Sequence, residues 1–169
     1  KLSALFLVLV SLTAVFAPWV APYSYETQDL SSLLSFPVAR HWMGTDRLGR
    51  DLLSRIIYGA RVSLSIGVAT SLIAVLIGTV YGAISGYIGG KTDNVMMRAV
   101  DVVFALPDLL LIILITVVLG RGMAGIFLAL TLVSWVTVAR LVRGEVLRVK
   151  ELAFVEASRA LGARHARIL

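Results

Sequence analysis

Four long apolar runs constrain this 169-residue chain more than any other feature of its sequence. They cover residues 2–20, 62–88, 95–119 and 126–142. A hydrocarbon core about 30 Å thick requires roughly 20 helical residues to cross it, so we expect each run to form a transmembrane helix. Because 59% of the residues are hydrophobic, the chain carries more apolar side chains than a water-soluble domain of this size can bury. The expected fold is an all-α, polytopic membrane protein.

The first run, residues 2–20, also has features of a secretory signal peptide. Lys1 precedes it, and Val15, Phe16 and Ala17 resemble a small-residue cleavage site. Pro18 directly after that site disfavours cleavage, and three more apolar runs follow. We therefore expect residues 1–20 to contain the first transmembrane helix.

Residues 21–61 form the expected external loop. Within it, "TDRLGRDLLSRIIYGAR" (residues 45–61) places apolar side chains at helical spacing opposite charged ones, which predicts an amphipathic helix on the membrane surface. Thr45 or Asp46 is expected to cap this helix, and Asp51 is spaced to form ion pairs with Arg47 and Arg55. A solvated helix of a small extramembrane domain is the alternative.

A row of glycines marks the second run. In "GTVYGAISGYIGG" a glycine recurs at every fourth position, namely Gly78, Gly82, Gly86 and Gly90. This spacing leaves a shallow groove on one helix face, where a neighbouring helix can approach closely. We expect helix packing there. Simple flexibility is a weaker explanation because glycine costs about 1 kcal/mol in a helix interior, and a substrate pore is a second alternative.

The third run contains two carboxylates and a proline: Asp101, Pro107 and Asp108. Proline removes a backbone hydrogen bond and bends a helix, and an intramembrane carboxylate is costly unless it faces protein or water. Asp101 and Asp108 are seven residues apart, which would place them on nearly the same face of a continuous helix. One interpretation is that the two carboxylates belong to a proton or cation path or to an intramembrane aspartyl enzyme. The other places Asp101 at the interface and Asp108 against a partner helix or a water-filled cavity.

Composition excludes several classes of function. The chain has no cysteine and only two histidines, which disfavours disulfides, thiolate chemistry and a metal site. It has no GxxxxGK[ST] loop for a nucleotide. The net charge of +6 fits cytoplasmic loops of a membrane protein better than nucleic-acid binding. If the C-terminal segment is cytoplasmic, that side carries ten of the Lys and Arg residues and the outer side six.

The C-terminal segment, residues 151–169, is basic, helical in pattern and rich in alanine. Small side chains at Ala157 and Ser158 permit close docking, Glu156 offers a carboxylate to a partner, and Gly162 permits a sharp change of backbone direction. A basic amphipathic helix on the membrane surface is the alternative, but it would require bulky apolar residues where this segment has alanine.

These segments resemble the type I permease subunits of ABC importers, specifically the C-type subunit of dipeptide and oligopeptide permeases. That family's cytoplasmic motif begins Glu-Ala-Ala, with a glycine six residues after the glutamate. Glu156, Ala157 and Gly162 match this pattern, Ser158 replaces the second alanine, and the Ile-x-Leu-Pro half lies beyond the chain. Two longer stretches, "HWMGTDRLGRDLLSRIIYGARVSL" and "WVTVARLVRGEVLRVKELAFVEASRALGA", resemble the segments of that subunit before its second helix and around its fourth.

The resemblance implies that residues 62–169 are part of an ABC transmembrane type-1 domain, with residues 151–169 as the coupling helix. It implies half of a peptide translocation path in a bacterial or archaeal inner membrane, with the coupling segment cytoplasmic. The implied partners are a B-type permease subunit, two ATP-binding cassette ATPase subunits and an external solute-binding protein. ATP and Mg would bind to the ATPase subunits, so this chain would be no enzyme and hold no cofactor. Six spans are usual in that family, so we expect a longer protein of which four spans are present.

Two alternatives remain open at this point. The same architecture carries nickel, glutathione or other small solutes in related complexes, and no residue in the sequence discriminates among them. A different class of function, an intramembrane proton channel or aspartyl enzyme, would use Asp101 and Asp108. That alternative leaves the segment from Glu156 to Gly162 unexplained.

Overall fold

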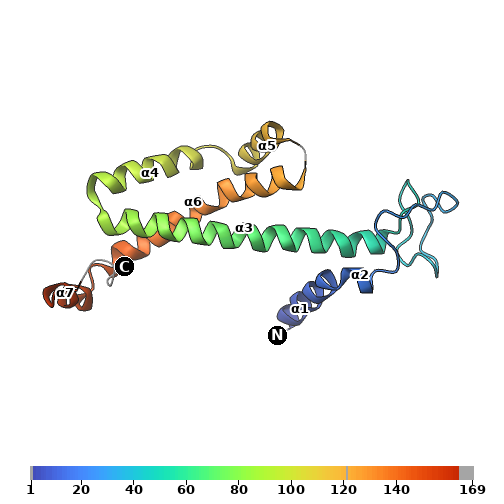
Figure 1. The fold of residues 1–169 in the computed structure, drawn as a ribbon, viewed down its shortest axis with the longest axis horizontal. Helices are drawn as coiled ribbons and strands as arrows, with labels where there is room; N and C mark the ends of the chain where they lie inside the picture. The colour runs from blue at the N-terminus through green and yellow to red at the C-terminus, as the bar shows by residue number, and fades with distance from the viewer. Residues whose placement is uncertain (1, 121, 164–169) are drawn as a thin grey trace. The chain divides into compact units, whose positions relative to one another are not determined.

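The structure is a computed structural model that describes residues 2–120 and 122–163. These residues form seven helices and no strand, so the all-α prediction is confirmed for them (Figure 1). Lys1, Arg121 and residues 164–169 of the predicted coupling helix lie outside the described residues. The helices are α1 (Leu2–Val15), α2 (Ala17–Val20), α3 (Leu52–Ile88), α4 (Gly90–Phe104), α5 (Asp108–Leu119), α6 (Met123–Val149) and α7 (Ala153–Ala160).

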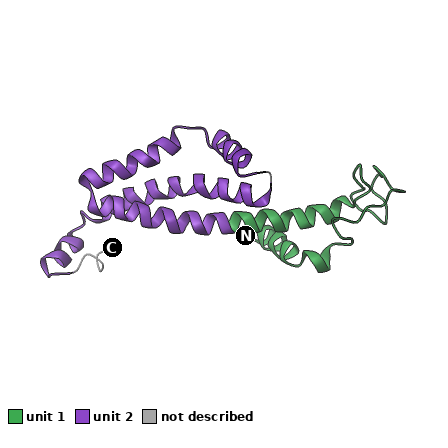
Figure 2. Cartoon of the chain, turned by 45° about the horizontal axis from the view of Figure 1, so that its top comes forward, with its two compact units in different colours: residues 1–68 green, residues 69–169 purple. Residues whose placement is uncertain are grey.

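The chain divides into two compact units, residues 1–68 (unit 1) and residues 69–169 (unit 2), as Figure 2 shows. Two helices, α3 with 37 residues and α6 with 27, are long and apolar enough to cross a membrane. The pair α4 and α5 passes the same test together, with a bend of 83° between its members. It counts as a third crossing if the pair is one span. The described residues thus contain two or three membrane-spanning elements and a shorter apolar helix, α1.

The first predicted span is divided in the structure. α1 ends at Val15, and α2 contains only four residues after a break at Phe16. Pro18 lies in the first turn of α2. A proline has no N–H to donate to the carbonyl four residues earlier, which explains why a continuous helix over residues 2–20 does not form.

The predicted interfacial helix begins later than its sequence pattern indicates. Residues 46–50 form turns, in which Asp46 accepts the N–H of Leu48 at 2.8 Å and that of Arg50 at 3.0 Å. α3 then begins at Leu52, and the Asp51 carboxylate accepts the N–H of Ser54 at 2.8 Å, as an N-cap residue does. Asp51 replaces Thr45 and Asp46 as the cap, and the helix continues without interruption into the second apolar run.

The predicted ion pairs of that segment are also different. Arg50 and Arg55 both pair with Asp46, at 2.9 and 2.5 Å, whereas Asp51 pairs with His41. Loss of water contact opposes the ionisation of Asp46. The N–H groups of Arg50 and Leu48 and the Arg50 guanidinium outweigh that effect and lower the pKa of Asp46 to about 2.

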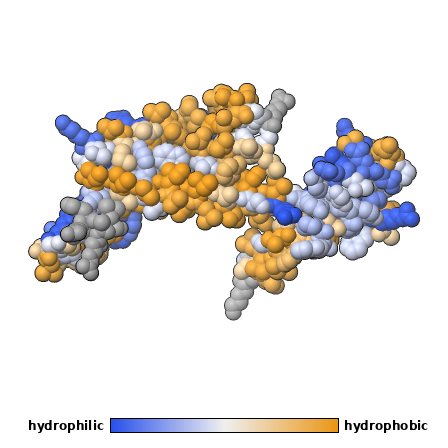
Figure 3. All heavy atoms as spheres, in the orientation of Figure 1, coloured by the Kyte–Doolittle hydropathy of each residue, from blue (hydrophilic) through white to orange (hydrophobic). Residues whose placement is uncertain are grey.

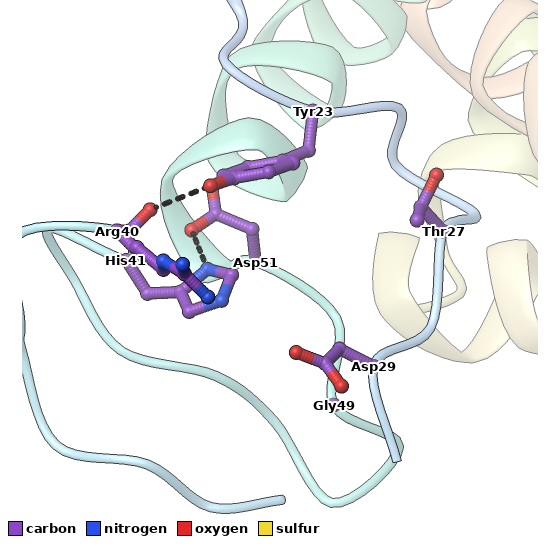
Figure 4. A pocket seen from close by; sticks show the side chains of 7 residues that line it. All are labelled: Tyr23, Thr27, Asp29, Arg40, His41, Gly49 and Asp51. Atoms are coloured by element: carbon purple, nitrogen blue, oxygen red, sulfur yellow. Dashed lines mark hydrogen bonds and ion pairs between the residues drawn. The ribbon is translucent and has the colours of Figure 1, made fainter. Parts of the chain in front are cut away.

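A small pocket of about 310 Å³ lies within the loop of unit 1 (Figure 4). In its wall, the Nδ1 atom of buried His41 lies 3.0 Å from the Asp51 carboxylate, and the Tyr23 hydroxyl donates to the carbonyl of Arg40 at 3.0 Å. Burial opposes the ionisation of Asp51, but hydrogen bonds from Ser54 and the contact with His41 lower its pKa below the usual range. These contacts tie the loop to the start of α3.

Unit 2 contains residues 69–88 of α3 together with α4, α5, α6 and α7. α5 packs along α6, and the Tyr81 ring meets the Trp135 ring edge-on at 4.9 Å between centroids. Many large apolar side chains of this unit stay exposed, and hydrophobic residues cover much of its visible surface (Figure 3). Such a surface suits contact with lipid or with other membrane subunits.

Candidate functional site

α7 is a short amphipathic helix whose motif residues face outward. Val155 is its buried residue, whereas Glu156 and Ala157 are exposed and Ser158 is half-buried. The Ser158 hydroxyl donates to the carbonyl of Phe154 at 2.7 Å, within the helix itself. Glu156 and Ala157 are therefore available to a partner.

Gly162 ends this helix by a defined mechanism. Its φ of 79° lies in the left-handed region that favours glycine. Its N–H donates to the carbonyl of Arg159 at 2.9 Å, and that of Ala163 donates to the carbonyl of Ser158 at 3.0 Å. This pair of bonds is a Schellman motif. The predicted change of backbone direction at Gly162 thus has a definite geometry in the structure.

Two cations attach the α7 segment to the end of α3. Lys150, at the C-cap of α6, donates from Nζ to the carbonyl of Gly86 at 3.0 Å. The Arg159 guanidinium of α7 lies 5.8 Å from the centre of the Tyr87 ring, within the range of a cation–π interaction. The segment that carries Glu156 is thereby attached to α3 at two points, through Lys150 before Glu156 and through Arg159 after it.

An ion pair with a buried carboxylate lies beside these contacts. Asp93, in the first turn of α4, accepts from Arg143 Nε at 2.5 Å and from Arg143 Nη2 at 2.5 Å. The Ser85 hydroxyl of α3 donates to the same carboxylate at 2.6 Å. Ser85 is fully buried, and Asp93 is 7% exposed. A two-pronged Arg–carboxylate contact fixes the relative angle of its partners as well as their distance.

Three of the four glycines in the predicted row face α6. A Cβ atom on Gly78 would lie 2.6 Å from the Val138 Cβ, and one on Gly86 would lie 2.9 Å from the Arg143 carbonyl oxygen. A Cβ on Gly82 would collide with the carbonyl of Ala139. Gly90 does not share this face: it is the first residue of α4, with a φ of 59° and open space around it. The row thus ends where α3 ends.

The structure separates Asp101 and Asp108. Asp101 lies in α4 and pairs with Arg140 at 2.6 Å, while Asp108 is the first residue of α5. The two helices are bent by 83° relative to each other, and Pro107 is the residue before α5. The predicted common helix face does not exist, because the helix that would have formed it is interrupted between the two carboxylates.

Sequence reasoning did not single out the pair of Asp93 and Arg143. The signal available for them was their chemistry, since a carboxylate three residues after a glycine pair and an arginine directly after an apolar run both require polar partners. Their connection could not be found from spacing, because fifty positions separate them. Among the described residues, no cluster of three or more His, Cys, Asp or Glu side chains could hold a metal ion.

Comparison with protein families gives two matches. The family described as the inner membrane component of binding-protein-dependent transport systems matches residues 74–169. The N-terminal transmembrane domain of oligopeptide transport permease C matches residues 1–37. The first match covers α4 to α7 and the glycine-bearing end of α3, and therefore the whole candidate site.

Individual relatives match nearly the whole chain. The oligopeptide transport system permease protein OppC of Bacillus subtilis (strain 168) is 46% identical over 163 residues, 96% of this chain and 53% of that protein. The dipeptide transport system permease protein DppC of the same organism is 45% identical over 169 residues, 99% of this chain and 53% of that protein. The glutathione transport system permease protein GsiD of Escherichia coli O157:H7 is 43% identical over 168 residues, 99% of this chain and 55% of that protein. This chain spans about half the length of these curated relatives.

Proposed function

Because the chain belongs to the family of binding-protein-dependent transport system inner membrane components, we propose that it acts as a permease subunit of an ABC importer for peptides. It is a multi-pass membrane subunit, and its helices form half of the translocation path of the transporter. The B-type permease subunit forms the other half, an external solute-binding protein delivers the peptide, and two cytoplasmic ATPase subunits supply the energy. ATP and Mg bind to those ATPase subunits.

The exposed surface of α7 carries this proposal. Phe154 is 62% exposed and Leu161 is 88% exposed, although the other exposed side chains of residues 153–162 are small or polar. Large bare apolar side chains beside an exposed carboxylate, Glu156, suit a groove in a partner protein better than bulk water. The ATPase subunit is the partner that we assign to this surface, which makes α7 the coupling helix.

The charges at this end of unit 2 support a cytoplasmic location for α7. Lys91 and Arg98 belong to α4, Arg140, Arg143 and Arg148 belong to the C-terminal half of α6, and Lys150 and Arg159 continue the series into α7. Loops and helix ends rich in Lys and Arg remain on the cytoplasmic side of a membrane. We propose that the protein lies in a bacterial or archaeal inner membrane.

Peptides are the proposed substrates because two of the most similar relatives are named for oligopeptide and dipeptide transport. Glutathione, which is itself a tripeptide, is the second candidate, because the relative GsiD is named for its transport. The proton channel and aspartyl enzyme considered above have lost their geometric support. Asp101 is paired with Arg140, and Asp108 lies on a different helix.

Glu156→Ala in the intact transporter tests the role of α7. We expect membrane insertion to be retained, while solute uptake and substrate-stimulated ATP hydrolysis are abolished, because the ATPase subunit loses the carboxylate that it recognises. Membrane fractionation, uptake into vesicles and phosphate release measure these three properties. Glu151→Ala is the matched control, since Glu151 is also exposed but precedes α7. Normal uptake by the Glu156 variant would refute the assignment.

A further inference from the structure

The corner between α3 and α4 receives three contacts from the segment that ends in α7. We define this corner by Ser85, Gly86, Tyr87 and Asp93. Arg143 binds Asp93, Lys150 binds the carbonyl of Gly86, and Arg159 lies over the ring of Tyr87. The three cations therefore follow the chain from the last two turns of α6, through its C-cap, into α7 itself. The corner and this segment are fastened at successive points.

The contact of Asp93 with Arg143 is the most directional of the three. Both carboxylate oxygens are occupied, and the Ser85 hydroxyl holds one of them from the side of α3. Asp93 is 7% exposed and the Arg143 side chain is 32% exposed, so water is largely excluded from the carboxylate but reaches part of the guanidinium. A carboxylate held from α3 and α4 that grips a guanidinium from α6 joins three helices at one point.

The glycine row makes this junction possible. Gly82 and Gly86 allow the α6 backbone at Ala139 and Arg143 to reach van der Waals contact with α3. A side chain at either glycine would displace the backbone from which the Arg143 guanidinium extends. The Asp93–Arg143 ion pair therefore forms at the short separation of α3 and α6 that these glycines permit.

Only a short connection separates α6 from α7. α6 ends at Val149, Lys150 is its C-cap, and α7 begins at Ala153 with Leu152 as its N-cap. A displacement of α7 moves Lys150 and Arg159 with it, and through α6 it moves Arg143. All three contacts then act on the same corner.

We infer that Asp93 and Arg143 are positioning residues of the transport cycle, which make the α3–α4 corner move together with α7. This inference rests on the proposed function, in which an ATPase subunit moves α7. The ion pair transmits that movement to α3 and α4, so that the membrane helices follow the ATPase subunits. Without the pair, α7 would still bind its partner, but the corner would no longer follow it.

Asp93→Asn and Arg143→Lys in the intact transporter, reconstituted in liposomes, test this inference. The probe is labelled trialanine or glutathione, whichever the wild-type transporter imports, and the readout is the number of ATP molecules hydrolysed per solute imported. We expect a roughly tenfold rise in this ratio, within the usual range of coupling between distant sites. The double variant Asp93→Arg with Arg143→Asp should restore part of the coupling that each single change removes.

Glu145→Gln is the matched control. Glu145 forms an ion pair with Arg148, which is also an Arg–carboxylate contact but is exposed and lies within α6 alone. This variant should keep the wild-type ratio. A purely structural role of Asp93 would lower assembly, ATP hydrolysis and import together, leaving the ratio unchanged, and that result would overturn the inference.

A fallback variant keeps the test decisive if Asp93→Asn fails to assemble. Ser85→Ala removes one hydrogen bond to Asp93 and leaves the ion pair in place, so it should assemble and show a smaller rise in the ratio. A wild-type ratio in assembled Ser85→Ala and Arg143→Lys transporters would overturn the inference. The proposed function would survive that result as long as Glu156→Ala abolishes uptake, so the two failures are distinguishable.

Discussion

Single carboxylates in the loop of unit 1 organise the start of the longest helix. Asp51 caps α3 through Ser54 and pairs with His41, while Asp46 closes the preceding turns and binds Arg50 and Arg55. Gly49, with a φ of 70°, packs its backbone against Asp29, where a Cβ atom would collide. The loop therefore owes its conformation to a few polar contacts rather than to an apolar core.

Acid should loosen this loop. The pKa of Asp46 is lowered to about 2 and that of Asp51 is also lowered, whereas an unfolded aspartate titrates at about 3.9. A lowered pKa stabilises the folded loop above the unfolded pKa, and the contribution is lost as the pH falls from about 4 toward 2. Hydrogen exchange of residues 24–51 between pH 7 and pH 2.5 measures the effect.

Asp46→Asn should show faster exchange already at pH 7, since it removes the partner of Arg50 and Arg55. Glu26→Gln is the control, because Glu26 is an exposed carboxylate in the same segment. Equal protection in the Asp46 variant and the wild type at pH 7 would contradict this account of the loop.

At the scale of helices, the apolar runs predicted that helices exist better than they predicted where those helices begin and end. Residues 62–88 are helical as expected, but α3 begins ten residues earlier, and α6 continues beyond residue 142 to Val149. The reason is that hydropathy reports where a chain prefers lipid, whereas helix ends depend on capping and turn chemistry such as that of Asp51. The break before α5 could be anticipated from Pro107, but its angle depends on packing.

The residues of the candidate site also fall into those that the sequence predicted and those that it did not. Glu156, Ala157 and Gly162 were predicted because their motif is local in sequence. The pair of Asp93 and Arg143 was not, because a contact across fifty positions depends on how α3, α4 and α6 pack. The glycine row lies between these cases. Its spacing predicted a packing face, but only the structure shows that Gly90 lies outside it.

The close contact of α3 with α6 leads to opposite effects for two glycines of one helix. Gly82→Ala should lower the free energy of unfolding by about 1–3 kcal/mol, because the added Cβ meets the backbone of Ala139. Gly67→Ala is the matched control, because nothing lies within 4 Å of its Cβ position. It should stabilise the protein slightly, since alanine favours a helix by about 1 kcal/mol over glycine.

Thermal unfolding of the purified permease in detergent measures both variants. The midpoint should fall for Gly82→Ala and rise or stay constant for Gly67→Ala. A higher midpoint for Gly82→Ala would mean that α6 does not lie against this face of α3.

At the scale of the whole molecule, the proposed function assigns membrane helices and a docking helix to this chain and assigns the chemistry that drives transport to its partners. The assignment of a peptide solute rests on the names of relatives that are about twice as long as this chain. Selection among solutes therefore has to be measured on the intact transporter.

Competition for uptake distinguishes the proposed substrates. Labelled trialanine uptake into cells that express the intact transporter should be reduced by an excess of unlabelled dialanine or pentaalanine. If the path is specialised for glutathione, only glutathione should compete. Competition by nickel ions alone would contradict a peptide path, and cells that lack the transporter provide the background.

The interruption between α4 and α5 leaves backbone carbonyl groups that need hydrogen-bond partners from outside these helices. Pro107 has no N–H to offer the carbonyl of Val103, and the last carbonyls of any helix lack partners within it. In hydrocarbon an unpaired carbonyl costs roughly 2–7 kcal/mol, so water or a neighbouring subunit has to satisfy these groups. If the pair is one span, water or a polar group of a neighbouring subunit reaches the backbone between two apolar helices, at a level of the membrane that the hydropathy of the sequence alone would describe as purely apolar.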